Sequence, residues 1–192
     1  MTLDKLFAAA LFSAVATGTI VGGWPAVAAD MAVEVGGQTM LPSQNIVQNA
    51  VNSSDHTTLV AAVKAAGLAD TLASPGPFTV FAPTNAAFAR LPTGTVQSLI
   101  QPQNKAALSG ILTYHVVPGR LDAAVLEQKI AAGGGKAMLK TVAGGMLTAA
   151  MNGPSNITIA DAAGAVAAIS TYDVYQSNGV LHVIDRVLLP KS

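Results

Sequence analysis

The stretch that decides the fold lies near the end of the chain: Asn178-Gly-Val-Leu-His-Val-Ile-Asp-Arg-Val-Leu-Leu-Pro190. The Asn-Gly pair at its start is among the strongest short signals for a hairpin turn. The apolar residues that follow, between Val180 and Val187, fall on both faces of an extended strand, because side chains alternate sides along it. The stretch is therefore predicted to form a strand buried on both sides of a sheet.

Further β-compatible runs precede this strand, and glycine-rich turns such as Gly144-Gly145 and Asn152-Gly153-Pro154 separate them. Short runs divided by turn residues are typical of a β-meander. The second half of the chain is predicted to form such a meander over residues 137–142, 146–151, 157–160, 166–172 and 180–189.

The first half has helical patterns instead. Asp55 is expected to cap a helix whose inner face carries Leu59, Val60 and Val63, and which Gly67 ends. Asp122 is placed to cap a second helix that runs to the Gly133-Gly134-Gly135 stop. Helices gathered in one half and a meander in the other indicate a single α+β domain.

Two more segments stand out in the middle of the chain. In Phe78-Thr-Val-Phe-Ala-Pro-Thr-Asn-Ala-Ala-Phe88, Pro83 ends a short strand and Thr84 or Asn85 is placed to cap the following helix. Its phenylalanines at 78 and 88 are expected to enter one core together with Val80.

The other segment is Thr113-Tyr-His-Val-Val-Pro-Gly119. Residues 114–117 are predicted to form a strand, which would turn Tyr114 and His115 to opposite faces, so that only one of them faces the core.

Together the three segments resemble the fasciclin-like (FAS1) domain, and the likeness runs from about Asn45 to Pro190. It implies one domain over residues 44–190, with helices from the first half packed on a β-wedge formed largely by the second half. It also implies a structural role for the motif positions Phe78, Phe81, Pro83, Thr84, Asn85, Phe88, Asn178, Gly179, His182 and Asp185.

The resemblance further implies a function in adhesion or protein–protein interaction at the cell envelope. In animal members of the family a Tyr-His pair contributes to receptor binding, and Tyr114 and His115 are the matching positions. The alternative is that Tyr114 packs in the core and His115 only ends a strand. The expected partner is an envelope or extracellular protein or matrix component; the sequence leaves its identity and the oligomeric state open.

Residues 1–29 are typical of a signal peptide. An apolar run from Leu6 to Val21 precedes small residues at Ala26 and Ala28, the pattern of a cleavage site. An uncleaved anchor is the alternative, but the run is rich in Ala, Thr and Gly and weakly hydrophobic for a membrane span. We therefore expect a periplasmic or secreted protein, with the cell surface as a further location, and no membrane span after cleavage. Residues 30–43 are interpreted as an arm that packs on its own domain or reaches a neighbour.

Composition excludes several classes of function. Only 10% of the 192 residues are charged, the formal net charge is zero, and no basic stripe appears, so nucleic acid is not an expected partner. The absence of cysteine excludes disulfides, thiolate metal sites and a cysteine nucleophile.

Catalysis and metal binding are not expected either. His56 is predicted to be exposed in a first helical turn, His182 to be a hydrogen-bonded core residue, and His115 and His182 to lack a third metal ligand. Ser53 has no obvious base partner, and His182 and Asp185 should point to opposite faces of their strand. The chain is therefore expected to be neither an enzyme nor a cofactor protein.

A second hypothesis is the binding of a hydrophobic small molecule, since some fasciclin-like proteins carry carotenoids. The low charge and the residues Met138, Met146 and Met151 could line an apolar groove for a carotenoid or lipid. The alternative is that these residues belong to an ordinary core or hairpin.

Overall fold

The computed structural model describes residues 32–191. The predicted signal peptide at 1–29 and the first two residues of the predicted arm lie outside these residues. The helices are α1 (Ile46–Asn52), α2 (Thr57–Ala66), α3 (Ala69–Ala73), α4 (Asn85–Ala89), α5 (Thr95–Leu99), α6 (Lys105–Tyr114) and α7 (Ala123–Ala132), with 3-10 turns η1 (Ser54–His56) and η2 (Pro102–Asn104). The strands are β1 (Val33–Val35), β2 (Gln38–Met40), β3 (Phe78–Pro83), β4 (Val116–Pro118), β5 (Lys136–Lys140), β6 (Met146–Met151), β7 (Ile157–Ala160), β8 (Val166–Gln176) and β9 (Gly179–Ile184).

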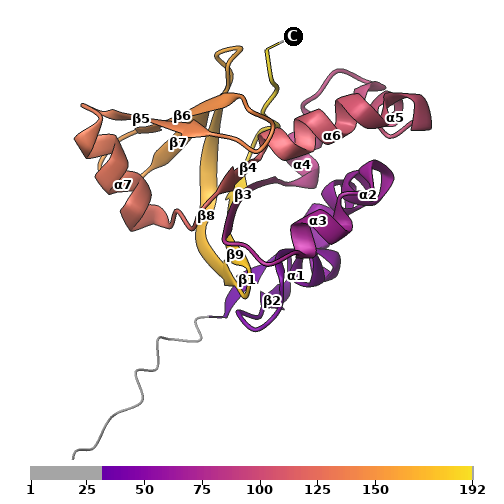
Figure 1. Ribbon diagram of the computed structural model, residues 1–192, viewed down its shortest axis with the longest axis horizontal. Helices are drawn as coiled ribbons and strands as arrows, with labels where there is room; N and C mark the ends of the chain where they lie inside the picture. The colour runs from indigo at the N-terminus through magenta and orange to yellow at the C-terminus, as the bar shows by residue number, and fades with distance from the viewer. Residues whose placement is uncertain (1–31, 192) are drawn as a thin grey trace, which may run out of the picture.

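The sheet that organises the domain has seven strands in the order β4-β3-β9-β8-β7-β6-β5. Strands β3 and β9 pair in parallel, with Phe78 opposite Gly179, and every other neighbouring pair is antiparallel. The long strand β8 pairs with β7 through its first residues and with β9 through the rest. Figure 1 shows β8 and β9 running between the helices on one side and β5, β6, β7 and α7 on the other.

Two apolar clusters form the core, one on each side of the central strands. Helices α1, α2, α4 and α6 pack on Val80 and Leu181, whereas α7 and the inner face of β5–β8 pack on Phe81 and Ile184. All six residues of β9 are buried, which confirms the predicted strand with two buried faces. Val80 and Phe88 are buried in the first cluster, and Phe78 packs against it, as expected.

Several element ends follow the sequence signals. The Thr84 hydroxyl accepts the Ala87 N–H, the Asp122 carboxylate accepts the Val125 N–H, and Gly67 ends α2 in the left-handed conformation. The prediction that Asp55 caps α2 is wrong: Asp55 lies within η1, and His56, without a capping side-chain hydrogen bond, precedes the helix. Ser53 and Ser54 form this extra turn because they bond to backbone carbonyls of the N-terminal hairpin.

Residues 33–40 form an antiparallel hairpin, β1–β2, on the domain itself. Val35 and Met40 are buried in the first core cluster. Gly36, in the turn, has a positive φ of 60°, and a Cβ there would lie 2.6 Å from the Ser53 hydroxyl. The described part of the predicted arm thus packs on its own domain.

Candidate functional site

Tyr114 is the last residue of helix α6 and is fully buried. Its hydroxyl donates to the Met146 carbonyl over 2.7 Å and accepts the Ala162 N–H over 3.0 Å. Burial raises the pKa of the hydroxyl, the Ala162 N–H opposes this, and the charge of Asp161 adds to it. The ring passes over Gly145, where a Cβ would lie 2.5 Å from it. Tyr114 therefore fastens α6 to two turns of the meander.

His115 follows directly and is also buried. Its Nδ1 donates to the Ile111 carbonyl over 2.8 Å, and its Nε2 accepts the Leu188 N–H over 2.9 Å. These partners fix the neutral tautomer with the proton on Nδ1. Burial lowers the pKa of His115 to about 4, against smaller opposing effects of the Ile111 carbonyl and Asp161.

The prediction of a strand over residues 114–117 is right for residues 116–117 and wrong for Tyr114 and His115. Helix α6 continues through Tyr114, because Leu108 and Leu112 extend its buried face at a spacing of four residues, and β4 begins only at Val116. Consecutive side chains on a helix lie about 100° apart rather than on opposite sides. Both Tyr114 and His115 therefore reach the interior, contrary to the expectation that only one would, and neither is exposed in the free domain. Their role in partner binding stays a prediction.

Among the motif residues of the first segment, Phe81 and Pro83 are buried in β3. The Asn85 side chain crosses to the turn before α2: its oxygen accepts the Thr58 N–H over 2.9 Å, and its nitrogen donates to the Ser54 carbonyl over 2.8 Å. Thr84, not Asn85, caps α4. The polar residues of this segment thus hold helices in place.

The motif residues at the end of the chain also serve the fold. Asn178 accepts the Ile46 N–H and donates to the carbonyls of Leu72 and Ser74, which joins the β8–β9 turn to two helices. A Cβ on Gly179 would lie 2.1 Å from the Phe78 carbonyl, so only glycine allows β3 and β9 to approach this closely.

His182 is a buried, hydrogen-bonded core residue, as predicted. Its Nε2 donates to the Leu121 carbonyl over 2.8 Å, its Nδ1 accepts the Asp173 N–H over 3.3 Å, and its ring stacks on Phe81. Burial lowers the pKa of His182, while the Leu121 carbonyl and the charges of Asp173 and Asp122 act in the opposite direction.

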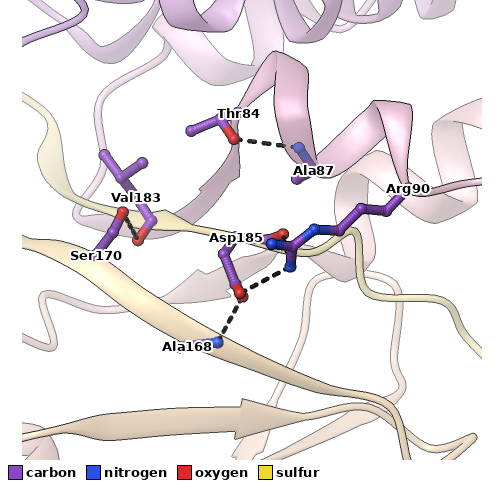
Figure 2. A network of polar contacts seen from close by, with 7 residues as sticks. All are labelled: Thr84, Ala87, Arg90, Ala168, Ser170, Val183 and Asp185. Atoms are coloured by element: carbon purple, nitrogen blue, oxygen red, sulfur yellow. Dashed lines mark hydrogen bonds and ion pairs between the residues drawn. The ribbon is translucent and has the colours of Figure 1, made fainter.

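Asp185 lies where the first and last motifs meet (Figure 2). Its carboxylate accepts the Ala168 N–H over 2.8 Å and contacts Nη1 of Arg90 at 2.9 Å. Burial alone would raise the pKa of Asp185, but these two donors and the charges of Arg90 and Arg186 lower it overall. His182 and Asp185 have separate partners, and Asp185 lies just beyond the end of β9. Sequence reasoning did not single out Arg90, whose partner lies at the far end of the chain.

Asp161 is a second residue that the motifs did not reveal. It is buried; one carboxylate oxygen accepts the N–H groups of Ala163 and Ala165, and the other accepts the Leu189 N–H over 3.0 Å. An aspartate that opens a turn containing glycine is a sequence signal for this role. Asp161 and His115 together hold the backbone of residues 188–189.

The residues that carry the three motifs are thus joined in one folded unit, and the family model of the fasciclin domain matches residues 54–190. The chain belongs to the fasciclin domain family. Protein sll1483 of Synechocystis sp. is 46% identical over 149 residues, which cover 77% of this chain and 74% of that protein. The immunogenic protein MPB70 of Mycobacterium bovis is 36% identical over 146 residues, 73% of this chain and 66% of the relative.

A solved structure has the same fold. The FAS1 domain pair from the insect cell adhesion molecule fasciclin I matches with a TM-score of 0.67 and 18% sequence identity. The match covers 78% of this chain and 52% of that one. The predicted single α+β domain of the fasciclin type is therefore confirmed.

The fasciclin domain contains one serine–histidine contact that sequence reasoning missed. The Ser53 hydroxyl lies 2.9 Å from Nδ1 of His56, and both residues are buried. The prediction that His56 is exposed is therefore wrong, because the turn η1 that contains His56 packs against α2 and α4. Burial lowers the pKa of His56, while the hydrogen bond to the Ala82 backbone and the charge of Asp55 act to raise it. A substrate has no access to this pair, so we interpret it as structural.

No group of three or more His, Cys, Asp or Glu residues that could hold a metal ion occurs within residues 32–191. In the same range no helix is long and apolar enough to cross a membrane.

The fasciclin domain also encloses an apolar cavity of about 60 Å³ between its helices and the central strands. Side chains from α1, α2, α3 and α6 line it together with Val80, Phe81 and Leu181. His115 and Lys64 are the polar residues in a lining that is otherwise apolar. Met138, Met146 and Met151 are not part of this lining; they lie on the meander, with Met138 62% exposed.

Proposed function

We propose that this fasciclin domain is a binding module that acts outside the cytoplasm, at the cell envelope or beyond it, by contact with a protein or matrix partner and without catalysis. One observation carries the proposal. The polar motif residues, from Thr84 and Asn85 to Asn178, His182 and Asp185, direct their hydrogen bonds to the fold itself. The motifs therefore build a scaffold, and a function of this domain must reside on its surface.

The proposed role in adhesion is supported by a protein of the same fold. The protein whose solved domain pair has the same fold is described as an insect cell adhesion molecule. A rigid scaffold with a low surface charge suits such a role, because contact with a partner needs complementary surface rather than a reactive group.

The test is saturable binding by the folded protein. The full chain, immobilised, is offered envelope proteins from its source cells, and cross-linked partners are identified and re-tested as purified proteins. We expect at least one partner to bind saturably. A folded protein that binds no envelope or matrix component, or that turns over substrates in a broad hydrolase screen, would contradict the proposal.

The predicted roles of Tyr114 and His115 need variants that stay folded. Tyr114→Phe and His115→Gln keep most of the buried volume, whereas alanine would leave a cavity in the core. If both folded variants bind the partner as the parent does, the two residues are structural only. If binding is lost while the circular dichroism spectrum is unchanged, the partner-binding role is supported.

Binding of an apolar small molecule is a second candidate, and the cavity beside His115 is the observation that favours it. Its volume of about 60 Å³ is small beside the ~300–1,000 Å³ typical of ligand pockets. A carotenoid would fit only if the surrounding helices moved apart, whereas a short apolar chain needs less rearrangement.

A visible absorption spectrum after incubation with carotenoids and lipids, followed by gel filtration, tests this candidate. Ala50→Leu is the matched variant, because Ala50 lines the cavity and a larger side chain would fill it. Coloured parent protein and colourless variant would support ligand binding. Colourless parent protein, with no lipid detected by mass spectrometry, would rule out the binding of an apolar small molecule.

A further inference from the structure

The outward face of the meander takes no part in the two core clusters. We define the outer sheet face by Lys136, Met138, Lys140, Met146, Thr148 and Val166. Along β5 the burial alternates, with Ala137 and Leu139 buried and the lysines and Met138 exposed. The inner side is covered by α7 and the second core cluster, so the outer side faces away from the core. In Figure 1, β5 and β6 lie at the end of the molecule opposite α1 and α2.

This face exposes three large apolar side chains, one on the edge strand β5 and one at the start of each of β6 and β8. Met138 is 62% exposed, Val166 49% and Met146 38%. In the strand register Met138 lies opposite Thr148, which pairs with Ala160, which in turn pairs with Val166. These residues form one row across four strands, and the central side chains are short. Neighbouring strands lie about 4.8 Å apart, so the row is a broad surface of about 14 Å.

The exposed charge on residues 136–170 has one sign. Residues 136–170 contain three charged side chains, Lys136, Lys140 and Asp161. Asp161 is buried and its two oxygens accept backbone N–H groups. The lysines are both exposed, on either side of Met138 on the outward side of β5. The face is therefore cationic at one edge and carries no exposed acid, which disfavours packing against a second copy of itself.

The residue types distinguish between two kinds of anionic partner. Protein interfaces draw most of their binding energy from Trp, Tyr and Arg, and lysine is depleted in them. Residues 136–170 contain no aromatic residue and no arginine. Lysine can instead lay its apolar stem on a hydrophobic surface and extend its ammonium group to phosphate, beside methionines that adapt to irregular contacts.

We propose that the outer sheet face docks on the surface of an anionic lipid bilayer. Met138, Met146 and Val166 contact the apolar boundary of the headgroup layer, and Lys136 and Lys140 bind lipid phosphates. This contact is separate from the proposed partner binding and does not depend on it.

A fluorescent probe tests the contact at a single position, because the chain has no cysteine. An environment-sensitive dye is attached to full-length Met138→Cys and, as control, to Val51→Cys, an exposed apolar position on α1 with 50% exposure against 62% for Met138. With phosphatidylglycerol-containing vesicles we expect a blue shift at position 138 and none at 51. Any affinity from the apolar run at residues 6–21 is common to both proteins. An unchanged spectrum at position 138 while the protein sediments with the vesicles would overturn the proposal.

Charge reversal supplies the second measurement. A lysine near an anionic membrane contributes about fivefold in affinity, so Lys136→Glu/Lys140→Glu should weaken vesicle binding by at least about 25-fold. The charge-matched control Lys64→Glu/Lys105→Glu lies on the helices and should change it less than about twofold. Equal losses in both double variants would overturn the proposal, because they would indicate an effect of net charge alone. A shift at position 138 with polyglutamate but not with the vesicles would also overturn it, in favour of an acidic polypeptide partner.

Discussion

The backbone N–H of Leu188 donates to Nε2 of His115 over 2.9 Å, and this bond ties the end of the chain to the end of helix α6. The imidazole can accept this hydrogen only while it is neutral. The next residue, Leu189, is held in the same way by the Asp161 carboxylate. The backbone at residues 188–189 is therefore held by one neutral acceptor, the His115 imidazole, and by one charged acceptor, the Asp161 carboxylate.

The first prediction concerns acid stability. The pKa of His115 is about 4 in the folded protein and about 6.5 when unfolded. Between these values the unfolded chain binds a proton that the folded protein does not, so the free energy of unfolding falls as the pH falls from 6.5 to 4. The expected slope is about 1.4 kcal/mol per pH unit for each such histidine. His56 and His182, whose pKa values are also lowered, steepen it. Urea unfolding at several pH values measures the slope of the unfolding free energy with pH.

His115→Gln isolates the contribution of this one residue. The variant should be less stable than the parent at pH 7.5, and its stability should change less with pH, by about 1.4 kcal/mol per unit between pH 6 and 5. Equal slopes for parent and variant would mean that His115 is not kept neutral by the fold.

The second prediction concerns the Tyr114 hydroxyl. Tyr114→Phe removes the donor to Met146 and the acceptor for Ala162 without opening a cavity, and should cost about 1–3 kcal/mol of unfolding free energy. Tyr175→Phe, on the half-buried part of β8, should change it by less than about 0.5 kcal/mol. Chemical denaturation of both variants checks the difference, and equal small effects would show that the two buried hydrogen bonds contribute little.

The third prediction uses one substitution at two sites. Gly179→Ala would place a Cβ 2.1 Å from the Phe78 carbonyl, force β3 and β9 apart, and should prevent folding or lower the melting temperature sharply. Gly110→Ala lies within helix α6 and meets no atom within 4 Å, so alanine should stabilise the protein by about 0.5–1 kcal/mol. Thermal unfolding should show a lower melting temperature for Gly179→Ala and a higher one for Gly110→Ala than for the parent protein. A stable Gly179→Ala protein would contradict the close approach of the two strands.

The fourth prediction separates charge from hydrogen bonding at Asp185. Asp185→Asn retains an oxygen for the Ala168 N–H and loses only the half-exposed ion pair with Arg90, which should cost less than about 1 kcal/mol. Asp185→Ala also leaves the Ala168 N–H without its acceptor and should cost about 1–3 kcal/mol. Unfolding in 0.1 M and 1 M salt completes the test, and an asparagine variant as unstable as the alanine variant would assign the effect to the ion pair.

Local sequence signals predicted the fold well where neighbouring residues decide the structure. Thr84 and Asp122 cap their helices, Gly67 ends one, and a hairpin turns at Ser177-Asn178, one residue before the predicted Asn178-Gly179 pair, because each acts within a few residues. The errors occurred where distant segments decide. His56 is buried, and its turn η1 packs against α4, which lies about 30 residues further along the chain. Tyr114 is buried together with His115 because its hydroxyl finds partners in turns more than 30 residues away.

For the candidate site, too, local features could be predicted from the sequence and contacts between distant segments could not. The motif residues could be identified from the sequence, but their partners could not, because Arg90 meets Asp185 and Asn178 meets Leu72 only in the folded chain. The outer sheet face was anticipated only as a group of methionines, since strand register is needed to show that Met138 and Val166 share a row with Thr148.

The parallel pairing of β3 with β9 has a consequence for how the protein is made. Phe78 can pair with Gly179 only after residues 79–178 have been synthesised, because β9 follows the other six strands of its sheet in the sequence. Until then β3 has β4 as its neighbour on one side and an open edge on the other, with the apolar side chains of both cores uncovered. Folding must therefore close a very long loop in its final step, which is entropically costly and slow. A chain interrupted anywhere before Gly179 would leave one edge of β3 unpaired and would lack Leu181 and Ile184, which β9 supplies to the two core clusters.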